Sequence, residues 1–160
     1  MTNHTPAEHE VGDGATLARA FADAHFHIDI GTERHEVRIG QPCPALEQAL
    51  AAASFGYVTA WNPDAEPREI PGNMQADDHL AGRLTALGIE HVRMWSADAE
   101  GAHREAGWLL QEVDADRVDA LGREFQQAGV LHWTRGEPVR LRMLRWRGAC
   151  VRLPFVDWIE

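Results

Sequence analysis

Two kinds of hydrophobic periodicity alternate along this chain, and this alternation constrains its fold more than any other feature. Residues His25–Ile30 alternate strictly between polar and apolar, which is typical of a strand with one buried face. Leu80, Leu84 and Leu87 repeat at the spacing of a helix with one buried face. Helices that alternate with strands predict layers of helix packed on a sheet.

The same periodicities, together with turn and helix-end signals, predict the helices and strands in chain order. Helices are predicted over 14–24, 44–53, between Pro71 and Gly88, and between Asp114 and Gly129. Strands are predicted over 25–30, 36–39, 55–61, 90–96, 107–113, 130–133 and 139–144. The prediction is therefore a single α/β domain, a layered fold with a mixed β-sheet of about six to seven strands and about four helices.

The predicted domain covers residues 14–145. Residues 1–13 are polar and are expected to form a disordered tail. Residues 146–160 are expected to be a C-terminal tail that packs on the domain, where Phe155 and Trp158 dock and an edge strand can be added.

The charge of the chain is acidic and unevenly distributed. The sequence has 25 acidic and 15 basic residues, a net charge of −10, and every basic residue is arginine. The absence of lysine excludes a Schiff-base lysine and a P-loop lysine. Six arginines lie in 135–160, and Arg140 and Arg142 share one strand face. Because the rest of the chain repels a polyanion, we expect these arginines to contact the domain's own acids, including Asp157 and Glu160, and not nucleic acid.

Cysteines and the N-terminus favour a cytoplasmic protein. Cys43 and Cys150 are far apart and form no disulfide framework, so both are expected to be reduced and buried. Met1–Glu10 lacks the basic and apolar regions of a signal peptide. No apolar stretch approaches the length that crosses a bilayer, so no membrane partner is expected.

Nine histidines raise the question of a metal site. His25, His27 and Asp29 share one face of a predicted strand, and His35 can approach from the hairpin partner. However, alternation alone places such residues on an outer face, and no HExxH or CxxC motif supports a metal. We expect no metal and no cofactor, with His25 and His27 partly exposed.

An ordered set of polar motifs occupies the middle of the chain. Thr59-Ala60-Trp61-Asn62-Pro63 ends a predicted strand, Asn73 comes shortly before a helix, Glu105 opens a later strand, and Phe125-Gln126-Gln127 closes a helix. In these motifs and their order, the segment from about Tyr57 to Trp133 resembles a family of small bacterial proteins classed as domain of unknown function 3293. The resemblance implies a fold and a shared site, but no known activity.

The candidate ligand-binding residues follow from these motifs. They are Thr59, Trp61, Asn62, Asn73, Glu105 and Gln127. Trp61 and Asn62 come at the carboxyl end of a predicted central strand, where α/β sheets bind ligands. Amide and carboxylate groups without a positive charge suit a neutral polar or a cationic ligand better than a phosphate. The alternative is structural: Asn62 before a proline forms a turn, Asn73 caps a helix, and Trp61 belongs to the core.

Two functions stay open. The favoured one is a module that binds a small polar ligand or a protein through a pocket near Trp61 and Asn62. The alternative is an enzyme in which Glu105 is the general acid or base and Asn62 and Gln127 orient the substrate. Either function requires Asn62 and Glu105 to lie in one connected region with Trp61 beside them. Cys43, at a predicted helix start, is expected to be buried and not nucleophilic.

Overall fold

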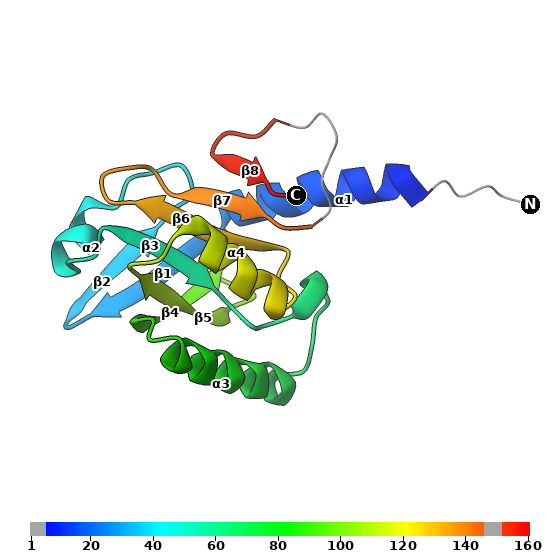
Figure 1. Cartoon of the computed structure of the whole chain (residues 1–160). Helices are drawn as coiled ribbons and strands as arrows, with labels where there is room; N and C mark the ends of the chain where they lie inside the picture. The colour runs from blue at the N-terminus through cyan, green and yellow to red at the C-terminus, as the bar shows by residue number, and fades with distance from the viewer. Residues whose placement is uncertain (1–5, 146–151) are drawn as a thin grey trace, which may run out of the picture.

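Eight strands form one mixed sheet in the computed structural model, which describes residues 6–145 and 152–160 (Figure 1). The strands are β1 (His25–Ile30), β2 (Glu33–Val37), β3 (Ser54–Val58), β4 (His91–Ala97), β5 (Glu105–Gln111), β6 (Gly129–Thr134), β7 (Arg140–Met143) and β8 (Val156–Trp158). Their spatial order is β2-β1-β4-β5-β3-β6-β7-β8. Neighbouring strands are antiparallel except for β7 and β8, which are parallel.

Helices cover both faces of this sheet (Figure 1). The helices are α1 (Pro6–Asp23), α2 (Pro44–Ala49), α3 (Ile70–Ala86) and α4 (Ala115–Glu124), with a 3₁₀ turn, η1 (Pro63–Ala65). Alternation along each strand builds two cores, since neighbouring side chains point to opposite faces. Leu109 belongs to one core together with Ala18 of α1 and Leu46 of α2. Leu110 belongs to the other core, together with Leu84 of α3 and Val118 of α4. The molecule therefore has three layers.

The predicted α/β class, the mixed sheet and the four helices are confirmed, but the strand count was too low. The additional strand is β8, which comes from the C-terminal tail and pairs with β7 through Leu141 and Val156. The backbone N–H of Leu141 donates to the carbonyl of Phe155 at 2.9 Å, and that of Ile159 donates to Met143 at 2.9 Å. These bonds satisfy backbone groups that the edge of β7 would otherwise leave open.

Two helices differ from the prediction at their ends. Helix α1 begins at Pro6, upstream of the expected start at Gly14, and proline is favourable in the first turn of a helix. Helix α2 ends at Ala49, although the alanines that follow predict its continuation to Ala53. The guanidinium of Arg135 donates to three backbone carbonyls at this end, those of Glu47, Leu50 and Ala52. This long-range contact stabilises an extended chain after Ala49 and overrides the local helix propensity.

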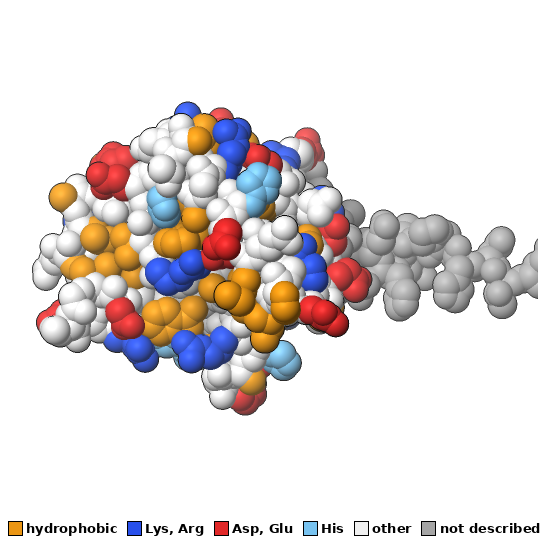
Figure 2. Space-filling view, turned by 90° about the horizontal axis from the view of Figure 1, so that it is seen from below, with side chains coloured by type: hydrophobic (Ala, Val, Ile, Leu, Met, Phe, Trp, Pro, Cys, Tyr) orange, Lys and Arg blue, Asp and Glu red, His pale blue; other side chains and the backbone are white. Residues whose placement is uncertain are grey.

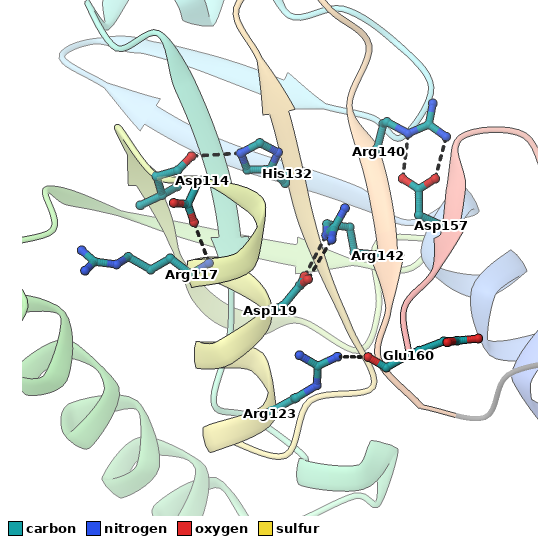
Figure 3. Close-up of polar contacts among 10 residues, drawn as sticks. Asp114, Arg117, Asp119, Arg123, His132, Arg140, Arg142, Asp157 and Glu160 are labelled. Atoms are coloured by element: carbon teal, nitrogen blue, oxygen red, sulfur yellow. Dashed lines mark hydrogen bonds and ion pairs between the residues drawn. The ribbon is translucent and has the colours of Figure 1, made fainter.

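Three of the six arginines in the C-terminal region pair with acids of the same domain, as expected, and Figure 3 shows two of them, Arg140 and Arg142. Arg140 binds Asp157 of β8 with two hydrogen bonds of 2.8 and 2.9 Å, and Arg142 binds Asp119 of α4 with two of 2.7 Å. Arg145 forms an ion pair with Asp64. On the opposite face of β7, Leu141 and Met143 are buried. Arg147 and Cys150 lie outside the described residues.

No helix in the described part of the chain has the length and apolarity needed to cross a membrane.

Candidate functional site

A cavity of about 510 Å³ lies at one end of the sheet, between α1 and the start of α3. The carboxyl ends of β3 and β4 lie here beside the amino ends of β5 and β6. This follows from the antiparallel pairing of β3 with β5 and β6, and of β4 with β5. Tyr57, Ser96 and Glu105 come from neighbouring strands and line the cavity beside Phe26. On the α1 side, the lining residues are Leu17, Ala20, Phe21 and Ala24.

All six predicted ligand-binding residues line this cavity. They are Thr59, Trp61, Asn62, Asn73, Glu105 and Gln127. Asn62 Nδ2 donates to Glu105 Oε1 at 2.6 Å, so the predicted proximity of these two residues, with Trp61 beside them, is confirmed. Whether the six residues bind a ligand stays a prediction.

Asn62 owes its position to an unusual backbone conformation directly after β3. Its φ is 47° and its ψ is 62°, in the left-handed region that asparagine tolerates better than most residues. Asp64 and Ala65 also have positive φ, at 59° and 57°. The backbone N–H of Asp64 donates to the carbonyl of Gln126 at 2.7 Å, which ties this turn to the end of α4. The Asn-Pro sequence thus folds back and aims the Asn62 side chain at β5.

Asn73 holds Asn62 in place and is not a helix cap as the sequence had suggested. Helix α3 already begins at Ile70, because Pro71 fits its first turn, so Asn73 lies within the helix and is 1% exposed. Its Oδ1 accepts from the backbone N–H of Asn62 at 2.9 Å and from Arg68 Nε at 3.1 Å. Its Nδ2 donates to Asn62 Oδ1 at 2.9 Å and to the Arg68 carbonyl at 3.1 Å.

Thr59 and Gln127 hold the backbone around the cavity. Thr59 Oγ1 donates to the carbonyl of Ala106 at 2.7 Å and accepts from the N–H of Trp61 at 3.1 Å. Gln127 Nε2 donates to the carbonyls of Trp61 and Phe125, at 3.1 and 3.2 Å. Because the donor nitrogen of Gln127 is used in this way, only its amide oxygen is left to orient a substrate.

Sequence reasoning missed Arg68, Tyr57 and Ser96. Arg68 joins the two asparagines, and its N–H donates to Asn62 Oδ1 at 2.9 Å. The Tyr57 ring lies against Gly107, where an added Cβ would be 2.6 Å from the Tyr57 hydroxyl. Only glycine leaves room for this ring, which is buried at the cavity. Strand alternation was a signal for Tyr57, since it places Tyr57 and Thr59 on the same face.

The electrostatics of the site centre on Glu105, which is half-buried. Burial raises the pKa of its carboxyl group, while the hydrogen bond from Asn62 and the charge of His103 act in the opposite direction. Burial also raises the pKa of Tyr57, and the negative charge of Glu105 adds to this effect. A raised pKa on a carboxyl group that lines a cavity is a common feature of proton-transfer sites.

His25 and His27 of β1 lie on the face of the sheet opposite to Phe26, which lines the cavity. His25 Nδ1 is 2.6 Å from Glu36 Oε1, and His27 stacks on Trp95 with ring centroids 5.6 Å apart. His35 does not join them: it pairs with Ile28 in the ladder, is buried and points to the opposite face. Within residues 6–145 and 152–160, no group of three or more His, Cys, Asp or Glu residues is arranged to hold a metal ion.

Cys43 is buried, and burial together with the nearby Glu47 raises its pKa to about 11. The thiol is therefore protonated at neutral pH and is a poor nucleophile, as expected from the sequence.

The surface near the cavity includes apolar side chains. Ile70, which lines the cavity, is 61% exposed, and Met74, one turn further along α3, is 57% exposed. Seen from the side of α3, the molecule shows several hydrophobic patches with basic and acidic side chains between them (Figure 2).

The middle part of the chain matches a known protein family. Residues 58–130 match the family described as "Protein of unknown function (DUF3293)". The resemblance is confirmed for this segment. The DUF3293 segment runs from the last residue of β3 to the start of β6 and contains the six predicted site residues. Helix α1 and its apolar lining residues lie outside it. No curated protein and no solved structure matches the chain.

Proposed function

We propose that this protein is a binding module for a small organic ligand, which it holds in the cavity between α1 and the sheet, with Glu105 as its polar anchor. One observation carries the proposal. Glu105 Oε1 is held by Asn62 at 2.6 Å, whereas no group in the described part of the chain donates a hydrogen bond to Oε2. Oε2 is therefore available to a hydrogen-bond donor on a ligand.

The shape of the cavity supports a small molecule. A volume of about 510 Å³ falls in the range of ligand pockets, which combine mostly apolar walls with a few polar groups. Leu17 and Phe21 supply the apolar wall, and Glu105 and Asn62 supply the polar end. The Asn62–Asn73–Arg68 bonds keep the polar end rigid before a ligand arrives, which reduces the entropy lost on binding.

The test uses neutral fragments of suitable size. Indole and benzyl alcohol are offered to the protein, and binding is followed by saturation-transfer difference NMR. Ala20→Trp adds a large ring on the α1 side of the cavity, where Ala20 is an exposed lining residue. We expect the wild type to bind and this variant to lose the signal. Ala86→Trp, an exposed position of α3 outside the cavity lining, is the control and should bind as the wild type does. Equal binding by both variants would contradict the proposal.

An enzyme is the second candidate, and the raised pKa of Glu105 is the observation that favours it. In this function Glu105 transfers a proton to or from a bound substrate, which Asn62 helps to orient. The discriminating measurement is an NMR time course of each fragment that binds. A product that forms with the wild type and not with Glu105→Gln would favour the enzyme over the binding module.

The proposed compartment is the cytoplasm, which two widely spaced cysteines outside a disulfide framework favour. The proposed partner is a small ligand and not nucleic acid, because Arg140, Arg142 and Arg145 are paired with acids of the domain.

A further inference from the structure

We infer that the ligand is an organic cation, a primary amine or an amidine on a compact apolar body, whose N–H donates to Glu105 Oε2. The inference rests on the proposed binding function and specifies the chemical class of the ligand.

The cationic side chains that line the cavity are engaged with groups other than Glu105. Arg68 donates to Asn73 Oδ1 and, through Nη2, to the carbonyl of Ala60 at 3.2 Å. The guanidinium of Arg104 lies over Trp95, 5.4 Å from the ring centroid. His103 acts on Glu105 through its charge, but its ring is 88% exposed and bonds to Asp98 at 2.8 Å. A half-buried carboxylate without a direct cationic partner favours a ligand that brings one.

The orientation of Asn62 disfavours an anionic ligand group at Glu105. Its Oδ1 accepts from the Arg68 N–H and from Asn73 Nδ2, both at 2.9 Å, so the amide cannot flip without losing both bonds. Its Nδ2 must therefore face Glu105 and is used there. What this pair offers a ligand is an acceptor oxygen with negative charge, which repels carboxylates and phosphates and attracts an ammonium or amidinium group.

The walls suit an organic cation and not a metal ion. Phe21, Phe26 and Trp61 line the cavity, and aromatic rings attract cations through their π faces. Hard metal ions need several oxygen ligands, whereas Glu105 is one carboxylate and, in the described residues, no cluster of metal-binding side chains surrounds it.

The test is a series of three ligands with one shape and three charges: 2-phenylethylamine, 2-phenylethanol and 3-phenylpropanoate. Dissociation constants are measured at neutral pH by NMR titration. We expect the amine to bind the wild type at least tenfold more tightly than the alcohol, and the acid to bind most weakly. Glu105→Gln keeps an oxygen acceptor for Asn62 but removes the charge, so the amine and the alcohol should then bind alike. Glu100→Gln, an exposed position outside the cavity lining, removes the same charge and should leave the preference unchanged.

The possible outcomes distinguish a failure of this inference from a failure of the proposed binding function. If amine and alcohol bind the wild type equally, or if Glu105→Gln keeps the preference, the inference is wrong. A third outcome is that no member of the series binds, while indole binds the wild type and does not bind Ala20→Trp. The inference about the cation is then wrong, but the proposed binding function stands. If Ala20→Trp leaves the binding of every compound unchanged, the cavity is not the binding site and both fail.

Discussion

Asn62 shows how one side chain sets the chemistry of the site. Its oxygen accepts from Arg68 and Asn73, so its NH2 group must face Glu105, a residue distant in sequence, and donates to it. Asn73 and Arg68 therefore position Asn62, and Asn62 in turn positions Glu105. Substitution of the positioning residue Asn73 should lower stability, whereas substitution of Glu105 should change how stability depends on pH.

Asn73→Ala tests the role of Asn73 as a positioning residue. The change leaves the backbone N–H of Asn62 and Nε of Arg68 without their acceptor, and unsatisfied groups of this kind cost about 1–3 kcal/mol. We expect the free energy of unfolding, measured with urea, to fall by about 2 kcal/mol. Gln75→Ala, at an exposed position of the same helix, should change it by less than about 0.5 kcal/mol. Equal effects would show that the Asn73 bonds contribute little.

Glu105→Gln tests the electrostatics of the same site through stability. Because burial raises the pKa of Glu105, the folded state binds more protons than the unfolded state between the ordinary glutamate pKa and the raised one. Stability is therefore lost as pH rises through this window. Glutamine does not ionise, and its oxygen can still accept from Asn62. We expect the variant to be more stable than the wild type at pH values above the raised pKa of Glu105. At pH values below the ordinary glutamate pKa, the two proteins should be equally stable. Urea unfolding over a range of pH checks this, and a variant that is less stable at high pH would contradict it.

At the scale of elements, β7 joins β8 to α4 through its two arginines (Figure 3). The two ion pairs have the same geometry but different surroundings. Asp119 is 2% exposed, whereas the side chain of Asp157 is 33% exposed. Water weakens the second pair far more than the first, so their contributions to stability should differ.

Arg142→Met tests this difference, with Arg140→Met as its matched control. Removing Arg142 leaves the buried carboxylate of Asp119 unpaired, which costs about 3 kcal/mol or more, whereas losing the exposed pair of Arg140 costs less than about 1 kcal/mol. Urea unfolding of both variants gives the comparison. The double variant Asp119→Leu with Arg142→Met should recover most of the loss, because no charge is then left buried. Equal losses in the two single variants would refute the distinction.

At the scale of the whole molecule, four of the C-terminal arginines are bound by groups of the domain itself. Arg140, Arg142 and Arg145 pair with acids, and Arg135 binds the carbonyls that follow α2. With a net charge of −10, the molecule as a whole repels polyanions.

We therefore expect no tight complex with nucleic acid. Fluorescence anisotropy with short single- and double-stranded DNA and RNA at about 0.15 M salt should show no submicromolar binding. Arg140→Ala with Arg142→Ala should leave the anisotropy as it is with the wild type. Salt-sensitive, submicromolar binding that this double variant weakens would make nucleic acid the leading partner.

Sequence alone determined what depends on near neighbours along the chain. Hydrophobic patterning predicted the strand over 107–113, which the structure has as β5, and its neighbouring residues Leu109 and Leu110 lie in separate cores. Asp114 was expected to begin a helix, and it caps α4 by accepting from the N–H of Arg117 at 2.8 Å. The ordered motifs of the family resemblance also singled out six of the residues that line the cavity.

Tertiary structure decided what depends on residues that are distant in sequence. It ended α2 at Ala49 through Arg135, turned His35 inward, and added β8 to the sheet edge. It also joined Asn62 to Glu105, because both antiparallel neighbours of β3 bring their amino ends to its carboxyl end. Local propensities differ by a few tenths of a kcal/mol, whereas burial and charged hydrogen bonds contribute about 1–3 kcal/mol each, so the distant contacts prevail where the two conflict.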